Sequence, residues 1–284
     1  MHSLRSERTG ISYLSNEAEE APLVVCMHGF PDIPRTWEPL TEALRDAGYH
    51  VVRPWLPGYA PSSLEGPFEP LSLSRTLLSF IEELSPDEPV RIVGHDWGSV
   101  IAQCAIAQWP ERFRAAALLG FPHLLAFEEN TKEHPGQLGR SAYIGLFQVP
   151  GLSDRWVKLR DFALIERLWR KWSPGFDPGR DYFDELKRCL RSSMPAPLQY
   201  YHALRSPKII VETRKLLSAG PIVVPTIYLH GERDGCVGPE IIEEQGAHFS
   251  ALFEQLILAD AGHFVHLERP QVVNEAIVKW LAAH

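Results

Sequence analysis

A sharp turn encoded at residues 91–99, RIVGHDWGS, constrains the fold more than any other part of the chain. Its first residues are apolar, as in a buried strand, and a helical pattern follows from Ser99. Gly94 and Gly98 allow an abrupt strand-to-helix turn that leaves the Asp96 side chain exposed at the carboxyl edge of a sheet. A carboxylate that only capped the helix would not need a small residue on each side. The turn therefore predicts an α/β sheet with a reactive group at a strand end.

Short apolar runs bounded by glycine and proline recur along the chain and indicate buried strands. They lie at residues 23–27, 50–55, 90–93, 115–119, 226–229 and 256–258. Helical patterns alternate with them at residues 36–47, 71–84 and 99–109, and a final helix is expected at 270–283. This alternation predicts a mostly parallel sheet with helices on both faces. An antiparallel edge strand is expected within residues 5–14.

The alternation stops after Phe121 and resumes near Ile222. The segment between them has helical periodicity, most clearly at residues 164–172. Pro-Gly pairs divide it into short helices at residues 150–151, 174–175 and 178–179. We therefore expect a core formed by residues 1–121 and 222–284, and a helical cap formed by residues 122–221. Core packing of the cap is the expected role of its tryptophans, Trp156, Trp169 and Trp172, and lining of an apolar pocket is the alternative.

Composition narrows the class of protein. A chain of 284 residues that is 45% hydrophobic can bury a large core, and its formal charge of −8 argues against a nucleic-acid groove or an anionic membrane surface. No apolar run approaches the roughly 20 residues that span a bilayer, and the first residues are polar, so we expect a cytoplasmic protein. The cysteines are far apart, lack metal-ligand spacing and are interpreted as buried free thiols: Cys26, Cys104, Cys189 and Cys236.

Two further loops follow apolar strands and carry groups that could work with Asp96. Asp234 follows the strand at 226–229, and His263 follows the strand at 256–258. The chain order of nucleophile, acid and histidine is the one in which the α/β-hydrolase fold carries its triad. We therefore expect Asp234 and His263 to complete a site with Asp96.

Three neighbouring residues are alternatives for these positions. His266 could replace His263, although a packing role is the expected one. Asp260 and Glu268 could replace Asp234, but they lie so close to His263 in sequence that they would not easily reach the far nitrogen of its ring.

The strand at 23–27 ends in the turn His28-Gly29-Phe30-Pro31. In this fold the N–H group after the glycine and the N–H group after the nucleophile together form an oxyanion hole. The expected donors are the backbone amides of Phe30 and Trp97. The turn can also be a loop bend around a buried His28 imidazole. Both interpretations can hold, because the oxyanion hole needs only the backbone N–H group and not the His28 side chain.

An aspartate at the turn selects a different reaction from a serine. A serine hydroxyl attacks acyl carbon, whereas an ionised carboxylate can displace a leaving group from saturated carbon. The resulting alkyl ester on Asp96 would then be hydrolysed by a water that His263 deprotonates, with Asp234 orienting the imidazole. A halide leaves with help from N–H donors alone, but an epoxide oxygen needs a proton, which a tyrosine can supply.

With these residues in place, the sequence resembles the soluble epoxide hydrolases of the α/β-hydrolase superfamily over nearly its whole length. The resemblance rests on residues 28–31, on 94–98, on Asp234 after its strand, and on Gly262-His263-Phe264. It implies an α/β-hydrolase fold with a mostly parallel eight-stranded sheet and a helical cap. It also implies a small apolar epoxide as substrate, a vicinal diol as product, and no metal or organic cofactor.

The resemblance also implies two ring-opening tyrosines in the cap. Tyr143 precedes a Phe-Gln-x-Pro-Gly turn at residues 147–151, and Tyr201 follows Pro197-Leu198. Tyr200 is the alternative if the register slips by one residue. Ile144 and its neighbour Gly145 depart from the bulkier or polar residues that the family often has there, which affects the expected pocket shape near Tyr143.

The expected substrate pocket is lined by Phe30, Pro31, Trp97 and Phe264. Two other functions remain alternatives. A haloalkane dehalogenase shares the turns around Asp96 and Gly29, but it commonly uses an Asn or a second Trp beside the Gly29 turn to hold the halide, whereas here Phe30 follows Gly29 and no Asn is near in sequence. A fluoroacetate dehalogenase favours an Arg in place of Trp97. A non-catalytic ligand-binding protein would have the pocket without turnover. The sequence does not indicate an oligomeric state.

Overall fold

The fold is built around one eight-stranded sheet in a computed structural model that describes residues 2–149, 151–250 and 252–284. The strand order is β1-β2-β4-β3-β5-β6-β7-β8, with parallel pairing from β4 to β8 and antiparallel pairing of β1 and β2. The strands are β1 (His2–Arg5), β2 (Ser12–Ser15), β3 (Leu23–Met27), β4 (His50–Pro54), β5 (Val90–His95), β6 (Phe113–Leu119), β7 (Thr226–Gly231) and β8 (Phe253–Leu258). The expected sheet and α/β-hydrolase fold are confirmed.

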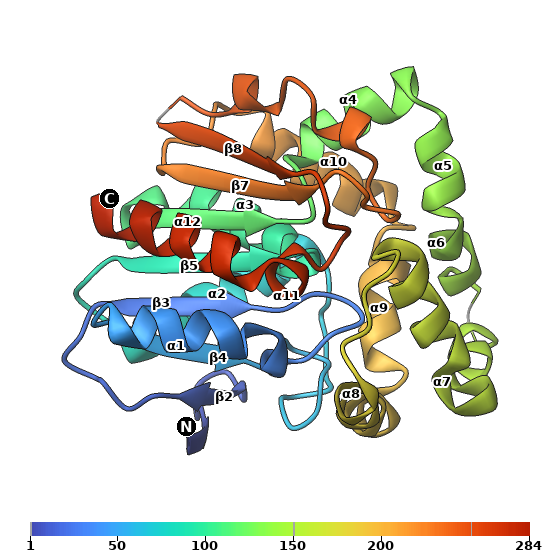
Figure 1. Ribbon diagram of the computed structural model, residues 1–284, viewed down its shortest axis with the longest axis horizontal. Coiled ribbons are helices and arrows are strands. Elements are labelled where there is room, and N and C mark those ends of the chain that lie inside the picture. The colour runs from blue at the N-terminus through green and yellow to red at the C-terminus, as the bar shows by residue number, and fades with distance from the viewer. Residues whose placement is uncertain (1, 150, 251) are drawn as a thin grey trace.

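Helices cover both faces of the sheet, as expected from the alternation (Figure 1). The core helices are α1 (Glu38–Asp46), α2 (Pro70–Leu84), α3 (Trp97–Gln108), α11 (Val265–Glu268) and α12 (Pro270–Ala283). Helices α1 and α12 pack on one face through an apolar cluster that includes Leu44 and Ile277. Helices α2 and α3 pack on the other face, where Leu77 and Ile101 belong to a larger cluster that continues into the cap. Short 3-10 turns span Pro34–Trp37, Pro110–Arg112, Pro239–Ile242 and Gln245–His248.

The edges of the sheet differ from the sequence expectation. Residues 5–14 were expected to hold one strand, but β1 and β2 form a hairpin in which His2 pairs with Ser15 and Arg5 pairs with Ser12. Gly10, at φ +68°, lies in the connecting turn, a conformation that glycine adopts readily. At the opposite edge, β8 was expected to be buried, yet Ile257 is 47% exposed, because β8 is the outermost strand of the sheet in the described part of the chain.

Seven helices follow one another between β6 and β7 within the described residues. They are α4 (Leu124–Glu133), α5 (Gly136–Arg140), α6 (Ala142–Phe147), α7 (Ser153–Trp172), α8 (Arg180–Ser193), α9 (Ala196–Ala203) and α10 (Pro207–Leu217). Helices α5 to α9 form a layer beyond the carboxyl ends of the parallel strands (Figure 1). The division into core and cap at residues 121 and 222 stays a prediction, and Pro150 of the expected Pro-Gly turn lies outside the described residues.

The cap is packed largely through aromatic side chains. Trp169 and Trp172 are buried, as expected, whereas Trp156 lies at the surface with 37% exposure. The ring of Trp169 stacks on Phe264 with centroids 3.4 Å apart, so α7 rests on the loop that carries His263. None of the helices in the described part of the chain combines the length and apolar character needed to cross a membrane.

Candidate active site

The turn at Asp96 carries its backbone strain on the aspartate itself. Asp96 has φ 52° and ψ −116°, a conformation that is unfavourable for a residue with a side chain. Gly94 and Gly98 are needed instead for close approach: a Cβ on Gly94 would lie 2.5 Å from the Gly98 oxygen, and a Cβ on Gly98 would lie 2.4 Å from the Met27 oxygen. The two glycines therefore let α3 start directly against β3 and β5, with Asp96 at the apex.

The Asp96 carboxylate lies against the turn that follows β3. Its Oδ1 accepts a hydrogen bond from the Phe30 amide at 2.8 Å. Gly29 passes so close that a Cβ there would lie 2.5 Å from that same oxygen. Burial raises the pKa of Asp96 above its ordinary value, and the charge of His263 and the amides of Phe30 and Trp97 reduce this effect. The turn thus supplies one N–H donor, from Phe30, to one carboxylate oxygen.

The side chain of His28 stabilises the same turn through two hydrogen bonds to the backbone. Its Nε2 accepts a hydrogen bond from the Leu56 amide at 3.1 Å, so its Nδ1 carries the proton and donates to the Gly29 oxygen at 2.8 Å. Burial lowers the pKa of His28 to about 4, which keeps the imidazole neutral. The buried imidazole considered from the sequence is therefore present together with the amide donor of Phe30.

His263 and Asp234 form a buried pair beside Asp96. Asp234 Oδ2 lies 2.8 Å from His263 Nδ1, while Asp234 Oδ1 accepts the amides of Cys236 and Val237. His263 Nε2 lies 3.8 Å from Asp96 Oδ2. Burial opposes the protonated imidazole, but the charge and hydrogen bond of Asp234 outweigh it, so the pKa of His263 is raised. The structure brings all three residues together.

The alternative acids and histidine lie elsewhere. Asp260 is at the surface, where it pairs with Arg233 at 2.8 Å. Glu268 accepts from Ser173 at 2.6 Å and from the Gly262 amide at 2.9 Å, so it supports the backbone of the His263 loop rather than the ring. His266 stacks on Trp37 with ring centroids 4.5 Å apart. Its expected packing role agrees with this position.

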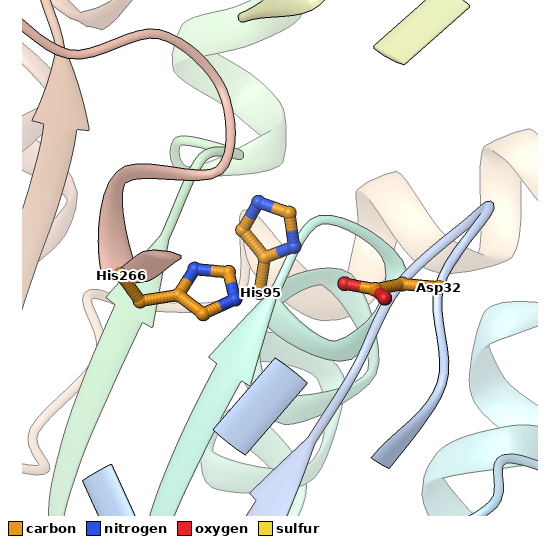
Figure 2. A group of neighbouring side chains, drawn as sticks. All are labelled: Asp32, His95 and His266. Atoms are coloured by element: carbon orange, nitrogen blue, oxygen red, sulfur yellow. The ribbon is translucent and has the colours of Figure 1, made fainter. Parts of the chain in front are cut away.

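A cluster behind His263 was not anticipated from the sequence. Asp32, His95 and His266 point toward one another from the loop after β3, the end of β5 and α11 (Figure 2). His95 Nε2 donates to the His263 backbone oxygen at 2.9 Å, and Tyr182 donates to Asp32. Burial raises the pKa of Asp32 to about 7. The sequence signal was the position of His95 directly before Asp96 and of Asp32 directly after Pro31.

The two expected tyrosines lie together over Asp96. Tyr143 and Tyr201 have ring centroids 5.9 Å apart, and the ring of Tyr201 packs edge-on against Trp97. Burial, together with the charge of Asp96, raises the pKa of both phenols well above 10.0, so both keep their protons at neutral pH. Tyr200, the alternative, points away and donates to the Pro57 oxygen at 2.5 Å.

A largely apolar cavity of about 300 Å³ reaches these groups. Asp96, Trp97, Tyr143 and Tyr201 form its polar end, and its remaining wall is mostly apolar, with Phe121, Leu124, Ile144 and Leu217 among the lining residues. Of the four expected lining residues, Trp97 belongs to this wall. Among the described residues, Phe30, Pro31 and Phe264 are not part of the lining; Phe30 instead packs edge-on behind Tyr201.

Cys236 is a second feature that the sequence analysis missed. Its Sγ lies 3.6 Å from the Tyr143 hydroxyl and close to both Asp96 and His263. Of the other cysteines, Cys26 and Cys104 are buried, whereas Cys189 is only partly buried. The signal in the sequence was the position of Cys236 two residues after Asp234. The loop that brings Asp234 to the His263 imidazole also brings this thiol close to it.

Comparisons with known proteins show the family to which this fold belongs. A family model described as alpha/beta hydrolase fold matches residues 22–270. Epoxide hydrolase 4 of Mus musculus is 27% identical over 95% of this chain and 75% of its own length, and epoxide hydrolase 3 of Xenopus tropicalis is 28% identical over 98% and 77%. The crystal structure of a putative epoxide hydrolase from Klebsiella pneumoniae aligns with a TM-score of 0.84 at 22% identity, covering 99% of this chain and 97% of that one.

Proposed function

The chain belongs to the alpha/beta hydrolase fold family, and from this membership we propose that it is an epoxide hydrolase that converts an epoxide and water to a vicinal diol. The observation that carries the proposal is the convergence of Asp96, Tyr143 and Tyr201 on one apolar cavity. A carboxylate and two protonated phenols at the same end of a cavity can attack a strained carbon and protonate the departing oxygen together. The names of the similar proteins support the same reaction.

In the first step, Asp96 Oδ2 attacks an epoxide carbon, because Oδ1 is engaged by the Phe30 amide. The carbon–oxygen bond of the ring breaks, and the alkoxide takes a proton from Tyr143 or Tyr201. Both phenols stay protonated at neutral pH, so they are available as donors. The product of this step is an alkyl ester on Asp96.

In the second step, His263 Nε2 removes a proton from a water that attacks the Asp96 carboxyl carbon. Negative charge develops on Oδ1, which already lies 2.8 Å from the Phe30 amide. Asp234 holds the imidazole by its Nδ1–H and stabilises the imidazolium that forms. Collapse of the intermediate breaks the bond between the Asp96 carboxyl carbon and the ester oxygen. The freed oxygen takes the proton of the new carboxyl group, which releases the diol and restores the Asp96 carboxylate. The proton on His263 returns to the tyrosinate that the first step left. Every proton moves between groups of this chain, water and substrate.

The cavity wall supports an apolar epoxide as the substrate class. Its lining is mostly aliphatic and aromatic, and Glu128 and Arg214, which pair at 2.9 Å, contribute to one part of it. A haloalkane substrate is less well served, because the side chain at the turn after Gly29 is Phe30, which offers no N–H to a halide. The cytoplasmic location and the lack of a nucleic-acid partner stay predictions.

The decisive experiment uses water labelled with heavy oxygen. The proposed route transfers one Asp96 oxygen to each diol, so repeated turnover in labelled water must place label in the Asp96 carboxylate. A His263→Gln variant should accumulate the alkyl ester as a mass increase equal to the substrate. Turnover without label in the peptide that contains Asp96 would exclude the route. Halide release from haloalkanes without diol formation from epoxides would favour the dehalogenase.

A further inference from the structure

Cys236 occupies a position that the proposed reaction does not use. Its Sγ, a carboxylate oxygen of Asp96 and a ring nitrogen of His263 all lie within 4.8 Å of one another. The three residues are 3%, 5% and 1% exposed, so this is an enclosed group, and Asp96 is its member that lines the cavity. Its neighbour Tyr143 contacts the sulfur at 3.6 Å. Sulfur, nitrogen and oxygen donors therefore converge within a few ångströms.

The imidazole of His263 is already oriented as a metal ligand. Its Nδ1–H donates to Asp234, which leaves a lone pair on Nε2, and this buried atom has no hydrogen-bond partner among the described residues. Histidines that bind metals commonly donate their other N–H to a carboxylate, which fixes the tautomer and ring orientation. Asp234 therefore orients His263 as a base and would also be the outer hydrogen-bond partner of His263 when that residue binds a cation.

We propose that Asp96, Cys236 and His263 form a binding site for a thiophilic divalent cation of the Zn²⁺ type. Tetrahedral Zn²⁺ with bonds of about 2.0–2.1 Å to nitrogen and oxygen holds those atoms roughly 3.4 Å apart. His263 Nε2 and Asp96 Oδ2 are 3.8 Å apart, so small side-chain rotations close the site. When the ion binds, the Cys236 S–H bond breaks, a Zn–S bond forms and the proton passes to solvent.

Charge and access support this site. One dication with one carboxylate and one thiolate is neutral overall, which suits an enclosed environment that disfavours net charge. The cavity reaches Asp96, so an ion that enters it meets the first ligand directly. The cluster of Asp32, His95 and His266 also has three metal-binding side chains, but it contains no sulfur, so a sulfur-sensitive measurement separates the two sites.

Occupation of this site inhibits the enzyme, a consequence that rests on the proposed function. The cation would engage both the nucleophile Asp96 and the lone pair with which His263 activates water. The expected result is reversible inhibition of diol formation by Zn²⁺ that a chelator relieves. Binding itself requires no epoxide, so the metal site can be tested whether or not the chain hydrolyses epoxides.

The experiment titrates the chelator-treated full-length protein with Co²⁺ and, separately, with Zn²⁺. Co²⁺ should give a sulfur-to-cobalt charge-transfer band together with the visible bands of a tetrahedral ion, saturating at one ion per chain. X-ray absorption of the Zn²⁺-loaded protein should show one sulfur neighbour at about 2.3 Å. A Zn²⁺ shell without sulfur, or a wild-type protein that gives no thiolate band, would overturn the site without affecting the proposed hydrolysis.

Variants locate the ligand. Cys236→Ala should abolish the thiolate band, and Asp234→Asn should weaken Co²⁺ binding about 10- to 100-fold, as loss of an outer partner does. Cys189→Ala is the matched control, because its partly buried thiol donates to the Ala60 oxygen and does not belong to the group of Asp96, Cys236 and His263; it should retain the band. Persistence of the band in Cys236→Ala contradicts the site. If Cys236→Ala does not fold, the X-ray absorption result on wild-type protein decides alone.

Discussion

Asp234 Oδ2 lies 2.8 Å from His263 Nδ1, and both side chains are fully shielded from solvent. A carboxylate can only accept hydrogen bonds, and the other oxygen of Asp234 accepts the amides of Cys236 and Val237. Nδ1 must therefore carry the proton, and Nε2, which faces Asp96 at 3.8 Å, keeps its lone pair. This single tautomer is the one that can deprotonate water next to an ester on Asp96.

Asp234→Asn should slow hydrolysis of the alkyl-enzyme far more than its formation. An amide can orient the ring in the wrong tautomer and cannot stabilise the imidazolium. The same substitution lowers kcat about 10⁴-fold in a comparable triad. The covalent ester should therefore accumulate, and intact-mass spectrometry after rapid mixing with an epoxide should detect it. Single-turnover kinetics should show ring opening within about tenfold of wild type.

Asp260→Asn is the matched control for this substitution. Asp260 follows the next strand but lies at the surface, paired with Arg233. Its loss should change neither kinetic step, because an exposed ion pair contributes little. Equal accumulation of ester in both variants, or none in Asp234→Asn, would show that the acid acts through another residue.

The pKa of His263 should differ between the free enzyme and the alkyl-enzyme. Burial lowers this pKa, but Asp234 and then Asp96 raise it, so in the free enzyme it lies above its ordinary value of 6.5. Esterification removes the charge of Asp96 and its contribution, so the pKa falls in the intermediate. Because the base must be neutral, hydrolysis should persist at a pH where the His263 of the free enzyme is already protonated.

This shift can be measured by comparing two titrations. Nuclear magnetic resonance of labelled histidine gives the pKa of His263 in the free protein. The pH dependence of single-turnover ester hydrolysis gives the pKa of His263 in the intermediate, as the acidic limb of the rate profile. The acidic limb should lie at the lower pH. A limb at or above the free-enzyme value would mean that the charge of Asp96 does not act on His263.

Tyr143→Phe and Tyr201→Phe should each slow ring opening by about 10²-fold or more, the usual contribution of a general acid. The double variant should lose ring opening almost completely while the fold is retained, because only two hydroxyl groups are removed. Stopped-flow measurement of tryptophan fluorescence can follow this step, since Trp97 packs edge-on against Tyr201. Wild-type rates in the double variant would assign the proton to another donor.

Tyr200→Phe distinguishes the register of the two adjacent tyrosines. Tyr200 is also buried, but its hydroxyl donates to the Pro57 oxygen. Its removal should therefore lower stability by about 1 kcal/mol, the typical contribution of one hydrogen bond, and leave ring opening unchanged. A large loss of ring opening in Tyr200→Phe would reverse the assignment.

The parts of the site that were predictable are those fixed by backbone pattern. The spacing of Gly94 and Gly98 around Asp96, and the position of Asp234 and His263 after successive strands, follow from a parallel sheet whose carboxyl ends meet at one edge. Asp32 and Cys236 were not anticipated, because their importance comes from side-chain contacts between distant segments. No local periodicity records those contacts.

The expected pocket lining shows the same limit. Trp97 was placed in the wall because it follows the nucleophile, and it lies there. Phe264 was placed there because it follows His263, but its ring instead turns to stack on Trp169 of α7. The direction in which a side chain points depends on the cap helices packed against it. The sequence pattern predicts that these helices exist, but it does not predict how they are oriented.

Gly98→Ala and Gly145→Ala should change stability in opposite directions, because the two helical glycines serve different purposes. A Cβ on Gly98 would meet the Met27 backbone oxygen at 2.4 Å, so α3 must move away from β3. Overpacking of this kind costs up to about 3 kcal/mol, which exceeds the gain of about 1 kcal/mol in helix propensity. Gly145 has nothing within 4 Å of its added Cβ, so alanine there should gain helix propensity without an opposing steric cost.

Urea unfolding checks both variants under the same conditions. Gly98→Ala should unfold at lower urea concentration than wild type and lose activity, because displacement of α3 moves Asp96 away from the Phe30 amide, now 2.8 Å from it. Gly145→Ala should unfold at slightly higher concentration, by roughly 0.5–1 kcal/mol. An unchanged midpoint for Gly98→Ala would mean that the strand-to-helix turn tolerates a side chain there. The tight approach of α3 to β3 would then not be what fixes the position of Asp96.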